Sequence, residues 1–327
     1  MRFYLIFNYA YRLIYKLHNT VAVMVGLKRL TTTQLSAWVQ QAKLLTHQGQ
    51  VANRIPQLAL ANPDLFAVYI CCGSGETYSQ GDTDCVFPLM SAIKPFSLLY
   101  LLELVGAERV FQWIGFEPSD APFNSLEQLV ADNGRPRNPM INSGAITLAD
   151  KLPGKDAITR THQLCNWLNQ LAGSHLKLDE VMLASVRSSN SQANQAITQY
   201  LAKARSVKNP DIALDTYEQI CCLSGRVEDL ARLGLLLACE CEFIKPQHRR
   251  IVNSLMLTCG LYKASSQYAL QIGLPMKSGI SGAVLAVVPG EGGVGCYSPA
   301  LDSTGNSVGA IAFVEGLSQG LQLSIFG

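Results

Sequence analysis

Apolar residues recur at two different spacings along the chain, and these spacings divide it into three parts. Short runs rich in β-forming residues occupy residues 64–72 and 76–79, with a Gly73-Ser74-Gly75 turn between them. Similar runs return in the last third, at residues 268–272, 283–288, 293–297 and 307–313, before a closing helix expected over 314–326. Residues 92–105 and most of 143–242 follow helical spacing instead. The pattern predicts an α/β fold in which one antiparallel sheet is built from both ends and flanked by helices, with an all-helical lobe inserted between them.

Composition places the chain among globular proteins with a large apolar core. It has 327 residues, of which 48% are hydrophobic and 15% charged, and its formal net charge is +2. Such a composition can fill a sizeable core and argues against disorder. Because Lys and Arg do not gather in one segment, the sequence predicts no nucleic-acid partner.

The ten cysteines show no metal-ligand spacing. They include the adjacent pairs Cys71–Cys72 and Cys221–Cys222 and one C-x-C, but no C-x-x-C, and no His lies at ligand spacing beside them. We therefore expect no metal site. Several lie within apolar runs, which is typical of buried, reduced thiols in a cytoplasmic protein.

Residues 1–30 are an apolar extension that precedes the predicted domain. Arg12 and Lys16 interrupt it, so it lacks the roughly 20 uninterrupted apolar residues of a transmembrane helix. Charges inside the apolar part also argue against a secretory signal. We expect an amphipathic extension without a firm membrane anchor, with weak contact to a membrane surface as the alternative. Residues 31–327 then form one domain, with a sheet lobe (31–115 plus 245–327) and a helical lobe (116–244).

Ser91 and Lys94 form an S-x-x-K tetrad, the first candidate for chemistry. Residues three apart share a helix face, so the hydroxyl and the amine can meet. Ser91 is expected at the helix start, where backbone amides and the helix dipole favour negative charge, and Pro95 suits the first turn. Apolar neighbours should desolvate the amine, lower its pKa and make it a usable base. The tetrad alone is common by chance, and a Ser that caps a helix is ordinary.

A second element, Lys277-Ser278-Gly279, strengthens this interpretation. Serine acyl-transfer enzymes of the β-lactamase type pair S-x-x-K with K-T-G or K-S-G on an edge strand. That strand borders the cleft, and its backbone N–H can complete an oxyanion hole. The order along this chain is the same, although a turn with an exposed Lys before a strand would explain the segment equally simply.

Several ordered segments together resemble the serine-dependent glutaminases. The segment from Phe87 to Pro95 resembles the nucleophile segment of that family, and the segment from Asn138 to Ile146 (NPMINSGAI) resembles its most specific signature, N-P-M-x-N-A-G-A. Further matches are Ile55–Ala59, Asn62-Pro-Asp64, Gly81-Asp82-Thr83, Gly260-Leu-Tyr262, Gly273–Ile280 and Gly305-Asn306-Ser307-Val308. The resemblance runs from about Leu35 to the C-terminus.

The resemblance implies a β-lactamase/transpeptidase-like fold, a set of site residues and no cofactor. Ser91 matches the nucleophile, Lys94 the base, and Tyr262 the Tyr beside the nucleophile. All three are expected to be catalytic, with Lys94 or Tyr262 taking the proton from Ser91. Four further positions match substrate contacts, namely Asn142, Asn194, Tyr217 and Ile280, the last through a backbone amide of the oxyanion hole. The implied reaction is hydrolysis of L-glutamine, a linear carboxamide, and the implied assembly is a homo-oligomer, either a dimer or a tetramer.

Three positions depart from the family pattern. Arg54 stands where the family usually has Tyr, and Met90 stands where it has Gln. Arg187 takes the place of the family's Glu, which pairs with the α-ammonium of the substrate. A cation there should repel that ammonium. The loss of one partner of a buried charge pair typically costs about 3–5 kcal/mol. The far end of the substrate is then expected to differ from free glutamine, unless Arg187 points away and another acid, such as Glu180, takes the role.

Two other functions stay open at this stage. One is hydrolysis of β-lactams or peptides by an enzyme of the same fold, against which the N-P-M-I-N segment argues. The other is a catalytically weak or binding-only relative, suggested by Arg54, Met90 and Arg187. Ligand stabilisation without product would identify the latter.

Overall fold

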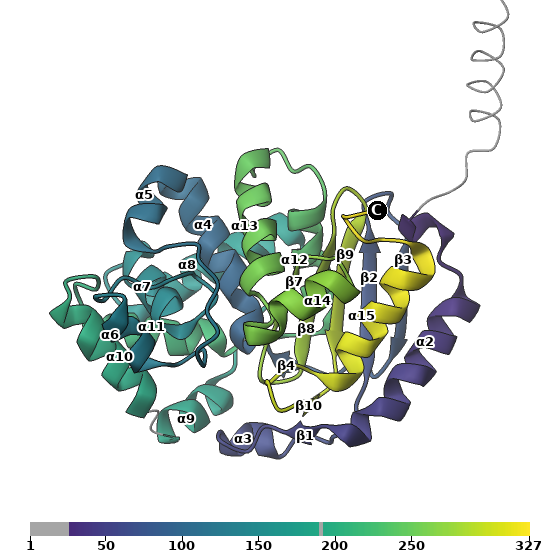
Figure 1. Cartoon of the computed structure of the whole chain (residues 1–327), viewed down its shortest axis with the longest axis horizontal. Helices are drawn as coiled ribbons and strands as arrows, with labels where there is room; N and C mark the ends of the chain where they lie inside the picture. Colours follow the sequence, from purple (N-terminus) through teal and green to yellow (C-terminus); the bar gives the residue numbers. More distant parts are fainter. Residues whose placement is uncertain (1–25, 190–191) are drawn as a thin grey trace, which may run out of the picture.

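The computed structural model describes residues 26–189 and 192–327, and its centre is a five-stranded antiparallel sheet (Figure 1). The strand order is β3-β2-β9-β8-β7. The strands are β2 (Ala67–Cys72), β3 (Thr77–Gly81), β7 (Met276–Ser278), β8 (Ala283–Val288) and β9 (Gly292–Tyr297). Because β2 pairs with β9, the two ends of the chain meet in one sheet, which confirms the predicted architecture. Most of the expected N-terminal extension lies outside the described residues.

Helices cover both faces of this sheet. The helices α2 (Thr32–Leu45) and α15 (Val308–Leu321) pack against each other on one face, and α12 (Val227–Ala238) packs on β9, β2 and β8 on the other (Figure 1). The side chains of β8 and β9 are therefore buried all along, which accounts for the unbroken apolar run from Ala283 to Val288.

Two of the expected strands are wrong. Residues 268–271 belong to helix α14 (Ser265–Gln271), and Ile272 caps its end. Residues 308–313 are the start of α15, and Ser307 caps that helix by accepting a hydrogen bond from the amide of Ala310. Short apolar runs do not distinguish a strand from a buried helix by spacing alone. In α15 the buried residues recur at helical spacing, from Ala310 to Leu321, because the helix faces the sheet along its whole length.

A helical region packs beside the sheet, at the left of Figure 1. Its helices include α6 (Leu126–Ala131), α7 (Asn142–Lys151), α8 (Ala157–Ala172), α9 (Glu180–Ser188), α10 (Gln192–Lys203) and α11 (Pro210–Cys221). Helices α4 (Lys94–Val105) and α13 (Pro246–Cys259) lie between it and the sheet, and α5 (Ala107–Trp113) packs on α4 at the upper left of Figure 1. The short α3 (Pro56–Ala59) contacts α9.

In the described part of the chain, five short strands form two small sheets outside the main sheet. One three-stranded sheet joins β4 (Phe87–Pro88), β6 (Leu223–Gly225) and β5 (Lys177–Leu178), and β1 (Gln50–Val51) pairs with β10 (Ala300–Leu301). Strand β4 leads directly into the segment that carries Ser91. Its pairing with β6 therefore ties this segment to the end of α11.

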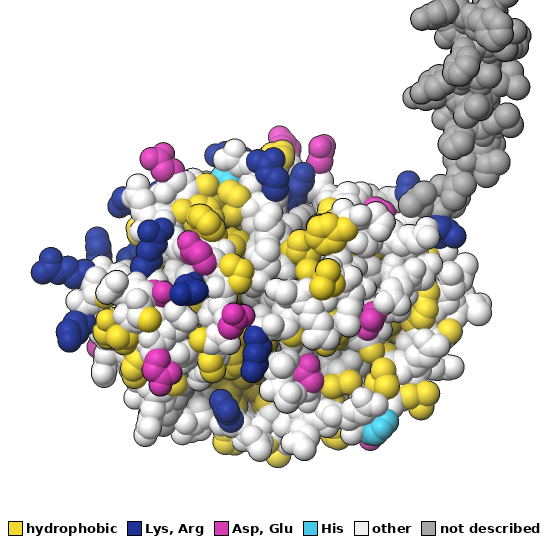
Figure 2. All heavy atoms as spheres, in the orientation of Figure 1, with side chains coloured by type: hydrophobic (Ala, Val, Ile, Leu, Met, Phe, Trp, Pro, Cys, Tyr) yellow, Lys and Arg dark blue, Asp and Glu magenta, His cyan; other side chains and the backbone are white. Residues whose placement is uncertain are grey.

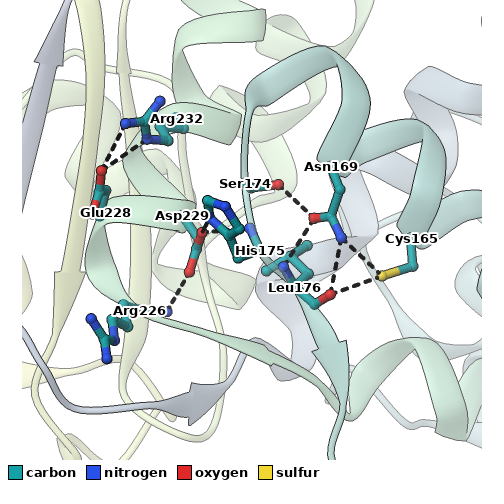
Figure 3. Close-up of polar contacts among 9 residues, drawn as sticks. All are labelled: Cys165, Asn169, Ser174, His175, Leu176, Arg226, Glu228, Asp229 and Arg232. Atoms are coloured by element: carbon teal, nitrogen blue, oxygen red, sulfur yellow. Dashed lines mark hydrogen bonds and ion pairs between the residues drawn. The ribbon is translucent and has the colours of Figure 1, made fainter.

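A polar cluster links α8 to the start of α12 (Figure 3). The Asp229 carboxylate accepts hydrogen bonds from the amides of Arg226 (2.8 Å) and His175 (2.7 Å). The Asn169 side chain accepts from the Leu176 amide at 2.9 Å and donates to the Leu176 carbonyl at 3.0 Å. These contacts satisfy backbone groups at a helix start and in a tight connection, so the cluster is structural.

The surface shows no stripe of one charge on the face drawn in Figure 2. Lys and Arg are most numerous over the helical region, with Asp and Glu among them. Within residues 26–189 and 192–327, no helix combines the length and the apolar character needed to cross a bilayer.

Candidate active site

A pocket of about 420 Å³ lies where the Ser91 segment, the helical region and the end of β7 meet. Five of the residues expected from the sequence line it: Ser91, Asn142, Asn194, Tyr217 and Ile280. The remaining two, Lys94 and Tyr262, are not among its lining residues but contact residues that are. Segments more than 180 residues apart in sequence thus form one cavity.

Ser91 lies in a 3₁₀ turn, η3 (Met90–Ile93), immediately before α4. The α-helix begins at Lys94 rather than at Ser91, so Ser91 does not cap it. The Lys94 amide donates to the Ser91 carbonyl, which places the two side chains one turn apart. Met90 has φ +48°, a left-handed conformation that is costly for a residue with a side chain and is often found at functional sites. Ser91 follows this left-handed residue and lines the pocket.

Lys94 is almost fully buried, with 1% of its surface exposed. Its Nζ donates to the carbonyl of Met140 at 3.1 Å and to Oδ1 of Asn142 at 2.8 Å, and it lies 5.6 Å from the centre of the Tyr217 ring. Burial lowers the pKa of Lys94 from 10.5 to about 8. No hydrogen bond joins Nζ to the hydroxyl of Ser91 in the part of the chain that the structure describes.

Asn142 connects the Lys94 amine to Asn194. Its Oδ1 accepts from Lys94, while its Nδ2 donates to Oδ1 of Asn194 at 2.8 Å. The segment that carries Asn142 is held by Asn138, whose Oδ1 accepts from the amide of Met140 at 2.9 Å. Gly144 makes the close approach possible, because a Cβ there would lie 2.0 Å from the carbonyl oxygen of Asn138. The N-P-M-x-N-x-G pattern thus corresponds to one tightly packed turn.

Tyr262 lies behind the pocket wall, in contact with lining residues. It has φ +58°, and its ring lies 5.0 Å from that of Phe123, a lining residue. The Tyr262 hydroxyl donates to the carbonyl of Ser278 at 3.4 Å. Burial raises the pKa of Tyr262 to about 12, against the opposing effect of hydrogen bonds with Ser278 and Ser91. The phenol is therefore protonated near neutral pH.

Strand β7 is the edge strand of the main sheet, as predicted for Lys277-Ser278-Gly279. The Lys277 side chain is not exposed. Its Nζ donates to the carbonyls of Gly260 (3.0 Å) and Ser278 (2.7 Å), and burial lowers the pKa of Lys277 far below its usual value. The Ser278 hydroxyl donates to Oδ1 of Asn306 at 2.6 Å. Lys277 and Ser278 therefore hold the strand in position instead of facing the pocket.

Gly279 allows the edge strand to lie against the Ser91 segment. A Cβ at this position would be 2.5 Å from the carbonyl oxygen of Leu89. Ile280, the next residue, lines the pocket together with Ser91. Among the described residues, the amides of Ser91 and Ile280 have no backbone acceptor. Two free N–H groups are thus available at the pocket wall.

Of the three departures from the family pattern, two line the pocket. Arg54 and Met90 belong to its wall, whereas Arg187 does not. The Arg187 guanidinium is paired with the carboxylate of Asp215 on α11. Glu180, the alternative acid considered above, is not a lining residue either.

Sequence reasoning missed several lining residues, namely Phe123, Asn124, Val186, Ser189, Glu218 and Cys221. Phe123 lies in a loop without periodicity, so no sequence signal identifies it. Glu218 and Cys221 are one and four positions after Tyr217 on α11. Helical spacing from Tyr217 therefore offered a usable signal for Cys221, which shares its face, but not for Glu218, the adjacent residue.

The comparisons with known proteins agree with one another. Residues 49–326 match the family model described as Glutaminase. A glutaminase of Synechocystis sp. is 41% identical over 303 residues, covering 92% of this chain and 92% of that protein. A glutaminase of Alkaliphilus oremlandii is 36% identical, covering 85% of this chain and 94% of that protein.

Solved structures give the same result. A probable glutaminase named ybaS superposes with a TM-score of 0.84 at 32% identity, over 91% of this chain and 99% of that one. The Bacillus subtilis glutaminase YbgJ, in its covalent complex with 5-oxo-L-norleucine, superposes with a TM-score of 0.81 at 30% identity. The match covers 90% of this chain and 99% of that one. With this fold, the chain belongs to the serine-dependent glutaminase family and is an amidohydrolase.

Proposed function

We propose that this enzyme hydrolyses L-glutamine to L-glutamate and ammonia through a γ-glutamyl ester on Ser91. The proposal is supported most directly by one observation: a buried amine with a pKa of about 8 lies one turn from a serine at the wall of a closed-in pocket. An amine with this pKa is partly neutral near pH 7 and can accept a proton. The names of the relatives support the choice of substrate.

In the first step Lys94 acts as the base. Its two hydrogen bonds, to Met140 and Asn142, occupy two N–H groups, so the neutral amine keeps its lone pair for the proton of the Ser91 hydroxyl. Catalytic hydrogen bonds often form fully only in the substrate complex, so Nζ is expected to close on Oγ when the pocket is filled. Tyr262, with a pKa of about 12, stays protonated and serves as a hydrogen-bond donor beside Ser91.

The ester forms when Oγ of Ser91 bonds to the carboxamide carbon of the substrate. The carbonyl oxygen becomes an oxyanion, and the free amides of Ser91 and Ile280 are the donors proposed to stabilise it. Lys94 returns its proton to the nitrogen, the C–N bond breaks, and ammonia leaves. Water then attacks the ester, Lys94 accepts the water proton, and this proton restores the Ser91 hydroxyl as L-glutamate leaves.

Ser91→Ala tests this scheme. We expect ammonia release from L-glutamine to fall by at least about 1000-fold, because the nucleophile is lost, while the thermal unfolding midpoint stays close to that of the unchanged protein. As a second measurement, 6-diazo-5-oxo-L-norleucine should add a 5-oxo-L-norleucine group to the peptide that carries Ser91. Full activity in the Ser91→Ala enzyme would refute the scheme. Stabilisation of the unchanged protein by L-glutamine without ammonia release would instead identify a binding-only relative.

A further inference from the structure

The α-ammonium of the substrate needs an anionic partner in the pocket, and the charges around the pocket differ from the family pattern. Where the family has Glu, this chain has Arg187, a cation. Its guanidinium is paired with Asp215 and does not reach the pocket wall, although its neighbour Val186 does. The cation is thus neutralised by an acid on the adjacent helix, and it leaves the pocket without the expected carboxylate on α9.

Another carboxylate is present on the facing helix. Among the described residues that line the pocket, Glu218 is the one acid and Arg54 the one guanidinium. Glu218 follows Tyr217 directly and lies three positions after Asp215 on α11. With Arg187 at +1 and Asp215 and Glu218 at −1 each, the group carries a net charge of −1, the same as a single Glu.

Within residues 26–189 and 192–327, the Glu218 carboxylate forms no hydrogen bond or ion pair with another side chain or with the backbone. It is half-buried, and burial together with the neighbouring Asp215 raises its pKa, with Arg187 acting in the opposite direction. An unpaired, partly desolvated carboxylate is costly unless a cation binds it.

We infer that Glu218 binds the α-ammonium of the substrate and is the residue that makes the enzyme select a free α-amino acid carboxamide. This inference rests on the proposed glutamine hydrolysis and assigns its specificity to α11 instead of α9. Arg187 then no longer repels the ammonium of the substrate, because its cation is paired with Asp215. Glu218, one turn further along α11, supplies the negative charge. Glu218 is a binding residue and takes no part in the bond-breaking steps.

The test compares two substrates that differ only in the α-amine, L-glutamine and glutaramate. With Glu218→Gln, we expect kcat/KM for L-glutamine to fall about 10- to 100-fold, mainly through KM, because a hydrogen bond to a charged group is lost. For glutaramate, which has no ammonium, kcat/KM should stay within about twofold of the unchanged enzyme. Glu180→Gln is the matched control, since Glu180 lies outside the pocket, and it should leave the preference for L-glutamine intact.

The inference is overturned if Glu218→Gln lowers kcat/KM for both substrates equally, or if Glu180→Gln is the variant that loses the preference. Failure of the proposed function looks different, because the unchanged enzyme would then release no ammonia from L-glutamine. In that case thermal stabilisation by L-glutamine still decides the role of Glu218. The stabilisation should be present in Ser91→Ala and lost in the double variant Ser91→Ala/Glu218→Gln. Equal stabilisation of both proteins would refute the inference.

Discussion

The pH dependence of catalysis follows from the environment of Lys94. Its pKa is about 8 instead of 10.5 because its Nζ is buried, and only the neutral amine can accept the proton of Ser91. A depressed lysine pKa means that the active form accumulates as pH rises through that value. The neutral fraction is then about 1% at pH 6, about 9% at pH 7 and about 91% at pH 9. We therefore expect kcat/KM to rise about 90-fold from pH 6 to pH 9, with a bend near pH 8.

The measurement is ammonia release at low substrate concentration, from pH 6 to pH 9 at constant ionic strength. The rise of about 90-fold and the bend near pH 8 are expected with glutaramate, which has no α-ammonium that could titrate in the same range. L-glutamine should show the same bend, but the loss of the proton from its own α-ammonium lowers the values toward pH 9. A lysine with its ordinary pKa would give an unbroken rise of about tenfold per pH unit through pH 9. Such a rise, or a flat profile over this range, would refute the assignment of Lys94 as the base.

Two further variants test the surroundings of this amine and of the edge strand. Asn142→Asp places an anion where the amide oxygen lies 2.8 Å from Nζ of Lys94. It should raise the pKa of Lys94 by about 1–3 units and move the bend of the pH profile to higher pH. A bend that stays near pH 8 would contradict this. In Gly279→Ala, the new Cβ must displace the strand from Leu89, and we expect kcat to fall about 100-fold as the Ile280 amide shifts. Gly290→Ala, in the β8–β9 turn where a Cβ meets nothing within 4 Å, is its control: it should cost stability but keep kcat, and equal kcat values for both Gly→Ala variants would disprove the argument.

Some features were readable from residue order alone, because their spacing is local. The three-residue separation of Ser91 and Lys94 places them one turn apart whatever surrounds them. Lys277-Ser278-Gly279 precedes an unbroken apolar run, and such a run is the pattern of a strand in a sheet that is covered on both faces. The pairing of strands from the two ends was also predictable, because β-rich runs occurred only there.

Other features were misjudged because short apolar runs are compatible with either a strand or a helix. The residues of α14 and the start of α15 alternate in a way that suggested strands. Packing on the sheet and the Ser307 cap select the helical period in α15, and packing against α13 accompanies it in α14. The left-handed turns at Met90 and Tyr262 had no sequence signal either, because neither residue type favours that conformation.

By itself, the sequence determined which chemical groups the enzyme carries and the order in which they come, since both depend on residue type and short separations. Tertiary structure alone decided their environment. Burial gives Lys94 its lowered pKa, the pairing with Asp215 removes Arg187 from the pocket, and the packing of α11 brings Glu218 into it. Desolvation and charge pairing depend on what surrounds a group in space, and segments distant in the chain supply those surroundings.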